Sequence, residues 1–400
     1  MPPTLLALDN PSVPIKAPFQ DPLDAPVALY VHVPFCERRC IYCDFATYTG
    51  QEAQTPAYLR ALDLEIARRS GGLGRPRAHT VFFGGGTPSL LSPAQVGGVL
   101  DTLRVHFALD ADAEVTLECN PGTVDLAALR GLRRVGVTRL SFGVQVLHDP
   151  TLAVLGRIHS AADALQAFSL ARQAGFTEIS GDLIYGLPDQ TMELWQETLQ
   201  GMIAADLPHL SLYALTPERG TPLYRALKRG ELTVPVSDVM AEMYEHARAA
   251  LAAHGYTQYE ISNWARPGHH SRHNLAYWEQ TPYLGFGLSA HSYFAGHRTA
   301  NLRGLDGYIT RLTAGRSPII HNETVDLDRA RSDGLILGLR LTAGVDVADY
   351  RARYGAAPAD LWPEEVAHLT ALSLLEQVEG RLRLTPAAYL IGNYVWEKFL

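Results

Sequence analysis

Short apolar runs alternate with amphipathic stretches over residues 28–214. The runs are rich in β-branched and aromatic residues, as is typical of strands, and the stretches between them carry apolar residues at helical spacing. The predicted strands are 28–33, 80–83, 113–118, 138–143, 178–182 and 210–214; the predicted helices are 58–69, 93–106, 124–135, 161–174 and 192–204. Strands that alternate with helices predict βαβ units around a parallel sheet. We therefore predict an α/β fold, an open and partial (β/α)6 barrel.

Polar or glycine-rich residues come at the carboxyl end of every predicted strand. A cysteine-rich loop follows the first strand, and Gly84-Gly-Gly-Thr-Pro follows the second. The later strands end in Glu118, Gly143-Val-Gln145, Asp182 and Tyr213-Ala214. Because the chemistry of such barrels collects at the carboxyl ends of the strands, these residues predict one shared site.

The rest of the chain divides into an arm, an irregular extension and a small domain. Residues 1–26 are rich in proline and predict a flexible arm, and residues 27–320 hold the barrel and its extension, with a helix over 239–253. Residues 321–400 predict a separate α+β domain that resembles a winged-helix module. Its predicted elements are helices over 328–340, 346–354 and 363–377, a hairpin near 378–384 and a final helix.

Composition narrows the classes of partner. Hydrophobic residues make up 47% of the chain and charged residues 19%, which is ordinary for a globular protein, and the formal net charge is −8. Residues 321–400 hold eight Arg or Lys against twelve Asp or Glu. This acidic balance argues against nucleic-acid binding. The sequence shows no signal peptide and no apolar run of 18 residues, so we expect a cytoplasmic protein with at most peripheral membrane contact.

Three of the four cysteines lie within eight residues, as Cys36, Cys40 and Cys43 in C-x3-C-x2-C spacing. Three clustered thiolates suit a four-iron cluster that leaves one iron open for reaction. Zinc is an alternative, with Cys119 or His32 as a fourth ligand, although structural zinc usually takes two separated ligand pairs. A disulfide is a weaker alternative, because it would leave an odd thiol in a chain without a secretory signal.

The glycine run 84–86 is a second candidate binding element. Glycine lets backbone N–H groups approach a ligand closely, and the run is neither a P-loop nor a dinucleotide-binding fingerprint. The alternative is a tight strand-to-helix turn without a ligand.

These motifs together resemble the radical S-adenosylmethionine (SAM) superfamily. The resemblance lies in residues 30–36, in the cysteine spacing with Tyr42 before the last cysteine, and in the glycine run. It implies a [4Fe-4S] cluster on Cys36, Cys40 and Cys43, whose open iron binds SAM through the amine and carboxylate of its methionyl part. It also implies that the glycine turn meets the SAM amino group, that Tyr42 lies near adenine, and that an electron donor such as flavodoxin or ferredoxin reduces the cluster.

Within the superfamily, residues 27–395 resemble the oxygen-independent coproporphyrinogen III oxidase-like family, which includes both the oxidase (HemN) and the HemW heme chaperones. The resemblance implies a HemN-type C-terminal domain and SAM contacts at matching positions. These positions are Tyr30, Gly85, Gly86, Thr87, Glu118, Gln145, Arg157, Asp182 and Ala214. For Glu118, Arg157 and Asp182, an internal salt-bridge network at the mouth of the barrel is the alternative.

Two departures from the oxidase and one motif favour the chaperone group. Asp44-Phe45 stands where the oxidase has a further cysteine, and only 35 residues precede Cys36. The stretch 273–278 matches the HNxxYW motif of HemW proteins. The resemblance thus implies a carrier that binds heme, with His273 as a candidate ligand, and passes it to an acceptor protein. The alternative function is a decarboxylating oxidase, so the sequence leaves open whether the protein is an enzyme. A homodimer is also possible. The alternative for His273 is a hydrogen-bonded structural histidine.

Overall fold

The structure, a computed structural model, describes residue 19 and residues 25–400, so the predicted arm lies almost wholly outside the described residues. Six parallel strands form the centre of the fold and pair in chain order, which confirms the predicted partial barrel. They are β1 (Val27–Val33), β2 (Arg77–Gly85), β3 (Ala108–Cys119), β4 (Arg139–Gln145), β5 (Glu178–Tyr185) and β6 (His209–Ala214). Asp182 does not end the fifth strand as predicted, because that strand continues to Tyr185.

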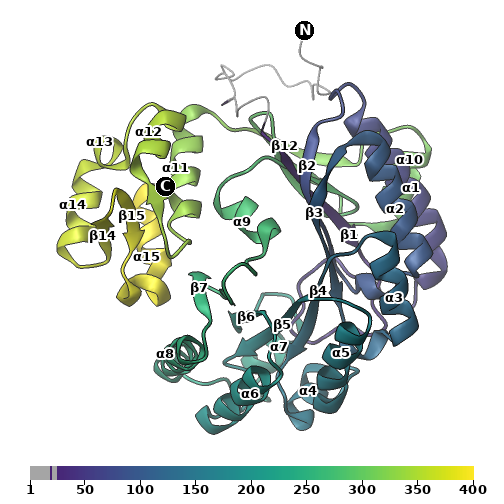
Figure 1. Cartoon of the computed structure of the whole chain (residues 1–400), viewed down its shortest axis with the longest axis horizontal. Helices are drawn as coiled ribbons and strands as arrows, with labels where there is room; N and C mark the ends of the chain where they lie inside the picture. Colours follow the sequence, from purple (N-terminus) through teal and green to yellow (C-terminus); the bar gives the residue numbers. More distant parts are fainter. Residues whose placement is uncertain (1–18, 20–24) are drawn as a thin grey trace.

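The central strands turn mainly apolar residues toward the helices and mainly polar residues toward the inside. In β4, Leu140, Phe142 and Val144 are fully buried in the main core, while Ser141 bonds across the inner face to Asp182. The helices cover the outer face (Figure 1). They are α1 (Thr55–Ser70), α2 (Pro93–His106), α3 (Leu126–Val135), α4 (Asp149–Leu155), α5 (Ala161–Gln173) and α6 (Met192–Ala204). This alternation is what gives the barrel a polar interior.

Side-chain caps fix where these helices begin. Ser92 and Gln95 form a capping box at the start of α2, as expected from the Ser-Pro sequence. Helix α3 begins at Leu126, two residues later than predicted, because Asp125 caps it by accepting from the Ala128 N–H. Short 3-10 turns lie at Glu52–Gln54, Pro88–Leu90 and Pro121–Thr123.

The sheet extends beyond the six predicted strands on both sides. Within residues 25–400 it has 12 strands in the order β12-β11-β10-β9-β1-β2-β3-β4-β5-β6-β8-β7, and it stays open. The added strands are β7 (Thr257–Glu260), β8 (Asn263–Ala265), β9 (Tyr283–Phe286), β10 (His291–Phe294), β11 (His297–Asn301) and β12 (Ile319–Thr324). Three helices lie among them: α7 (Pro222–Lys228), α8 (Ser237–Ala253) and α10 (Leu305–Thr313). No helix of the described chain is long and apolar enough to cross a membrane.

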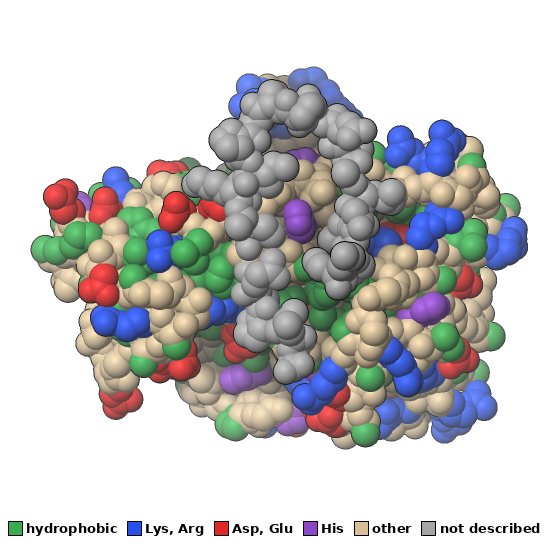
Figure 2. Space-filling model, turned by 90° about the horizontal axis from the view of Figure 1, so that it is seen from above, with side chains coloured by type: hydrophobic (Ala, Val, Ile, Leu, Met, Phe, Trp, Pro, Cys, Tyr) green, Lys and Arg blue, Asp and Glu red, His purple; other side chains and the backbone are tan. Residues whose placement is uncertain are grey.

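A second hydrophobic core lies in the C-terminal part, which has helices and a three-stranded antiparallel sheet. Its elements are α11 (Leu327–Gly338), β13 (Val345–Asp346), α12 (Val347–Tyr354), α13 (Pro358–Leu361), α14 (Pro363–Ala371), β14 (Leu375–Val378), β15 (Arg381–Leu384) and α15 (Gly392–Trp396). On the face in Figure 2, acidic side chains are interspersed with basic ones over this part.

Two predictions for this C-terminal part were wrong in detail. The helix predicted over 363–377 stops at Ala371, because Leu375–Val378 pairs with Arg381–Leu384 instead. The turn between these strands is Glu379-Gly380, with φ of 51° and 79°, which suits a two-residue hairpin. The final helix is broken, since only Gly392–Trp396 is α-helical between 3-10 turns at Pro386–Ile391 and Glu397–Phe399.

Candidate functional site

The cysteine loop is held against the carboxyl end of the barrel by backbone hydrogen bonds. Cys36 N–H donates to Tyr48 O at 2.9 Å, and Ile41 N–H donates to Leu155 O at 3.1 Å. Two side chains reach the thiols: Thr87 Oγ1 lies 3.4 Å from Cys36 Sγ, and Arg157 Nη1 lies 3.5 Å from Cys40 Sγ. The predicted contact residues Thr87 and Arg157 therefore lie beside the cysteines.

The described thiols are unbridged and partly shielded from solvent. Burial raises the pKa of Cys36 to about 11, although the Thr87 hydrogen bond opposes the shift. The pKa of Cys43 is also raised by burial. A positive centre would therefore be needed to hold these sulfurs as thiolates, which is what a bound iron cluster provides.

The geometry of the described residues does not favour the zinc alternative. No three His, Cys, Asp or Glu side chains among them converge closely enough to hold a single metal ion. His32 uses both ring nitrogens, with Nδ1 3.1 Å from Tyr30 Oη and Nε2 3.0 Å from Ala46 O. Cys119 is buried in the main core. A four-iron cluster accepts wider sulfur spacing, because each thiolate binds a different iron.

The glycine run is required by close packing of the chain. A Cβ on Gly85, whose φ is 112°, would lie 2.4 Å from the His32 ring, and one on Gly86 would lie 2.7 Å from Phe35 O. The Gly86 N–H donates to Val33 O at 2.7 Å and the Gly85 N–H to Glu118 Oε2 at 3.1 Å. These N–H groups thus have partners within the protein, so the tight-turn alternative accounts for their geometry.

Two carboxylates, Glu118 and Asp182, are buried on the inner face. Burial raises the pKa of Glu118 to about 8, and the nearby Asp182 raises it further, while the Gly85 N–H opposes the shift. Burial also raises the pKa of Asp182, against hydrogen bonds from serine hydroxyls such as Ser141. Among the described residues, neither carboxylate forms an ion pair with Lys or Arg.

The other predicted SAM contacts lie around the same strand ends. Arg157 Nη2 donates to Gly143 O at 2.6 Å, and its Nε is buried without a partner in the described chain. Because Arg157 bonds neither Glu118 nor Asp182, the salt-bridge alternative is wrong. Gln145 ends β4 at a positive φ of 71°, and Ala214 is exposed at the end of β6. Burial raises the pKa of Tyr42, and the Arg157 charge opposes that shift.

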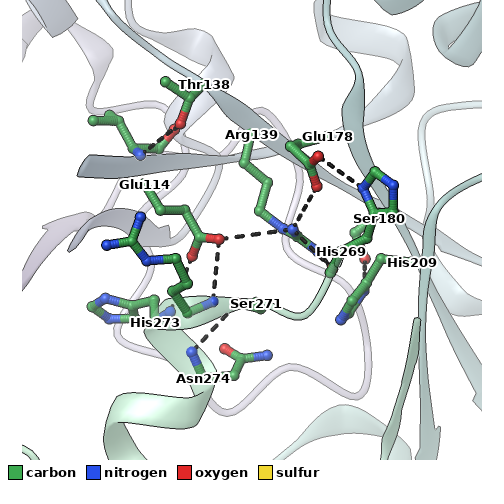
Figure 3. Close-up of polar contacts among 12 residues, drawn as sticks. Glu114, Thr138, Arg139, Glu178, Ser180, His209, His269, Ser271, His273 and Asn274 are labelled. Atoms are coloured by element: carbon green, nitrogen blue, oxygen red, sulfur yellow. Dashed lines mark hydrogen bonds and ion pairs between the residues drawn. The ribbon is translucent and has the colours of Figure 1, made fainter. Parts of the chain in front are cut away.

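The predicted HNxxYW stretch forms helix α9 (Arg272–Trp278), which lies on the concave side of the sheet (Figure 1). Ser271 caps the helix, and the Glu114 carboxylate accepts from the N–H groups of Arg272 and His273 at 3.1 and 3.0 Å. Arg139 lies between Glu114 and Glu178, at 3.7 and 3.1 Å (Figure 3). This network anchors α9 at the amino-terminal ends of the strands.

His273 lies inside the barrel. Its side chain is 1% exposed, Nδ1 lies 2.8 Å from Thr80 Oγ1, and Nε2 lies 3.0 Å from Tyr277 Oη. Burial lowers its pKa to about 3, so the ring is neutral. Tyr277 shares a helix face with His273, as expected from their spacing. Both nitrogens of the predicted heme ligand therefore have partners in this conformation.

Aromatic side chains of α9 contact both the inside of the barrel and the C-terminal part. Inside the barrel, the Phe82 ring stacks on His273 at 5.0 Å and on Tyr30 at 6.2 Å. Toward the C-terminal part, the guanidinium of Arg340 lies over Trp278 at 4.3 Å and over Trp396 at 5.3 Å. The motif thus connects a predicted SAM contact to the C-terminal domain.

The sequence prediction missed Ser141, Arg139 and Arg340. The first two alternate with apolar residues in β4, and this period-2 pattern could have assigned them to the inner face. Nothing near Arg340 in the sequence indicates that it contacts two tryptophans.

Comparison with known proteins places this geometry in context. Residues 30–201 match the radical SAM superfamily, and residues 326–391 match the HemN C-terminal domain. The heme chaperone HemW of Bacillus subtilis is 37% identical over 93% of this chain and 98% of its own. That of Mycobacterium tuberculosis is 37% identical over 96% of this chain and 97% of its own. The structure of the Escherichia coli coproporphyrinogen III oxidase HemN superposes with a TM-score of 0.82 at 26% identity, covering 94% of this chain and 90% of that one.

Proposed function

Since this chain belongs to the HemW family of the radical SAM superfamily, we propose that it is a heme chaperone that carries a [4Fe-4S] cluster and SAM. The observation that carries this proposal is the similarity to two HemW proteins along nearly the full length of both partners. The HNxxYW motif at 273–278 supports the same assignment. The chaperone would pass its heme to an acceptor protein in the cytoplasm.

The cysteine loop fits the cluster. Cys36, Cys40 and Cys43 would supply three thiolates, and the Arg157 guanidinium beside Cys40 would help to neutralise the charge of the bound cluster. The Arg157 Nε, which has no partner among the described residues, adds a donor at this position.

The inner face fits SAM. Glu118 and Asp182 are buried and form no ion pair with Lys or Arg in the described part of the chain, so they suit the ammonium and the ribose hydroxyls of SAM, while Arg157 can pair with its carboxylate. Cys36, Cys40 and Cys43 would hold the cluster, which would supply one electron for the reductive cleavage of bound SAM. Gln145, Ala214 and Tyr42 would complete the pocket at the strand ends.

Heme binding through His273 needs a change in α9. A neutral imidazole is a good iron ligand, so its protonation state is suitable. Iron could bind only after Nε2 leaves Tyr277 or Nδ1 leaves Thr80, and after the buried ring becomes accessible. We propose that heme selects a conformation in which α9 has moved out of the barrel.

A heme titration followed by the Soret band tests the proposal. We expect the wild type to bind heme, and His273→Ala to bind it more weakly with a changed spectrum. His270, a half-buried neighbour in the same stretch, offers the matched control His270→Ala. A wild type that binds no heme would refute the chaperone function; identical titrations for wild type and His273→Ala would refute only the ligand.

Anaerobic reconstitution tests the cluster. Cys36→Ala, Cys40→Ala and Cys43→Ala should each lose cluster iron, whereas Cys119→Ala should keep it because Cys119 lies in the apolar core. An activity assay tests the alternative function. Conversion of coproporphyrinogen III to protoporphyrinogen IX by the reduced, SAM-loaded protein would favour the oxidase. We expect no conversion, because Phe45 replaces the oxidase's extra cysteine.

A further inference from the structure

The solvent-facing side of the cysteine loop carries an unusual combination of side chains. From residue 34 to residue 48, the exposed residues are Glu37, Arg38, Arg39, Asp44 and Phe45. The Phe45 side chain is 67% exposed, although it follows Cys43 by only two positions. The loop therefore presents an apolar ring and charged groups directly beside the proposed cluster ligands.

Within the described residues, the arginines at this surface have no carboxylate partner. Arg39 Nη2 donates to the carbonyls of Cys43 and Phe45 at 3.3 Å, and Arg303 Nη2 donates to the Asp44 carbonyl at 2.9 Å. Arg38 makes no hydrogen bond or ion pair within the described chain. We call the surface made by Arg38, Arg39, Phe45 and Arg303 the loop patch.

Helix α7 extends the positive charge next to the loop. Its Leu223 N–H donates to Ile41 O at 2.9 Å, so the helix begins against the cysteine loop. The charged residues of α7 are Arg225 and Lys228, both exposed. The loop patch and α7 together have two acidic neighbours, Glu37 and Asp44, and five basic residues: Arg38, Arg39, Arg225, Lys228 and Arg303. This region is therefore net positive, although the whole chain carries −8. The positive charge is a local feature, so it points to an acidic partner.

We propose that the loop patch is the docking surface for an acidic one-electron carrier protein that reduces the cluster. This proposal rests on the proposed function, because it needs the cluster at Cys36, Cys40 and Cys43. One electron would leave the reduced carrier and enter the cluster, so the carrier is oxidised by one electron and the cluster is reduced by one. No bond is made or broken in this step.

The position of the patch favours an electron carrier as its occupant. A partner that contacts Phe45 and Arg39 lies against the backbone of Cys43, which is itself a proposed iron ligand. The inner side of the loop is closed by β1, the glycine turn and α4. Phe45 gives such a partner an exposed apolar contact next to Arg39 and Arg303, and an aromatic contact beside charged groups is common at interfaces.

Charge reversal on the patch tests the proposal. The double variant Arg38→Glu/Arg303→Glu leaves Arg39 in place, because Arg39 makes two hydrogen bonds to the loop backbone and Arg303 makes only one. The rate at which chemically reduced flavodoxin reduces the reconstituted cluster should fall at least ~10-fold at low salt, and Phe45→Ser should slow it as well. Reduction by dithionite should be unchanged, because that small ion needs no protein docking surface.

The control is Arg316→Glu, an exposed arginine without a carboxylate partner in the described chain. Arg303 precedes α10 and Arg316 follows it. The control therefore reverses the charge of another arginine, at the opposite end of the helix. A second measurement, by calorimetry, uses the cluster-free proteins. Oxidised flavodoxin should bind the wild type and Arg316→Glu with equal affinity, and it should bind the double variant more weakly.

Three results would overturn the proposal. The first is that flavodoxin reduces the cluster of the wild type and of the double variant at the same rate. The second is that Arg316→Glu lowers this rate as much as the double variant does. The third is that the double variant lowers the rate of reduction by dithionite to the same extent. Loss of heme binding in the double variant, with unchanged flavodoxin rates, would instead assign the patch to heme propionates. A wild type that assembles no cluster but still binds flavodoxin through the patch would refute the proposed cluster and leave the docking surface standing.

Discussion

At the scale of single residues, Glu118 is a buried carboxyl group whose environment favours the protonated form. Burial and Asp182 raise its pKa from 4.5 to about 8. Between these two pH values the folded state holds a proton that the unfolded state has released. The free energy of unfolding therefore falls as the pH rises through this window.

We predict that Glu118→Gln removes this pH dependence. The amide keeps an oxygen for the Gly85 N–H but cannot ionise, so the cluster-free variant should match the wild type near pH 5. It should be more stable by about 2–4 kcal/mol near pH 8.5. Thermal midpoints at both pH values measure the effect. A gain of equal size at pH 5 would show that the cause is packing and not ionisation.

Tyr277 is the residue that competes for the proposed iron-binding nitrogen of His273. Its hydroxyl lies 3.0 Å from Nε2, and such a bond contributes about 0.5–1.5 kcal/mol. Tyr277→Phe keeps the ring and frees the nitrogen, so heme should bind about 2- to 10-fold more tightly in a Soret titration. Tyr394→Phe, on the exposed surface, is the control. Weaker binding in Tyr277→Phe would mean that the hydroxyl itself takes part in heme binding.

At the scale of elements, α9 is held in the barrel by charge. The carboxylate of Glu114 accepts from the first N–H groups of the helix, and Arg139 is 2% exposed between Glu114 and Glu178. A negative group at a helix N-terminus is favourable, and here it is a buried group that itself needs a cation nearby.

Arg139→Leu should therefore destabilise the protein strongly. Removing one partner of a buried pair leaves Glu114 uncompensated, which costs about 3–5 kcal/mol. Urea unfolding of the cluster-free protein measures the loss, and α9 should exchange its amide hydrogens faster. Arg351→Leu breaks a surface pair with Asp360 and should cost less than about 1 kcal/mol. Equal losses in the two variants would contradict the anchoring role of Arg139.

At the scale of the whole molecule, Arg340 joins the barrel to the C-terminal domain. Its guanidinium lies over both Trp278 of α9 and Trp396 of α15, and it pairs with the buried Glu260 at 3.4 Å. A planar guanidinium can stack on two rings while it keeps its ion pair, which an ammonium group does less well.

Arg340→Lys should loosen this connection while it keeps the charge beside Glu260. We expect faster amide hydrogen exchange in α9 and α15, with little change in the central strands. Mass spectrometry of exchanged peptides measures it. The control Arg383→Lys alters a half-exposed pair with Glu376 within the C-terminal domain. Unchanged exchange in α9 would show that the tryptophans pack independently of Arg340.

Local patterns in the sequence were sufficient to predict most of the barrel and the centre of the site. Periodicity predicted six βα units, because alternation and helical spacing are properties of neighbouring residues. The rule that polar residues gather at the carboxyl ends of parallel strands placed Glu118 beside the glycine turn and Thr87 beside Cys36. Asp182 lies near Glu118, although its strand continues to Tyr185. The short strands β7–β12 were missed, since three to six residues give little periodic signal.

The position of α9 was decided only by the tertiary structure. The sequence marked His273 as chemically important, and the fold buries it against Thr80, 193 residues earlier in the chain. The anchoring of the helix by Glu114 and Arg139, and the stacking of Trp278 on Arg340, likewise join residues far apart in sequence. Such contacts depend on how whole elements pack, so spacing and composition alone determined the chemistry of the motif but not its accessibility.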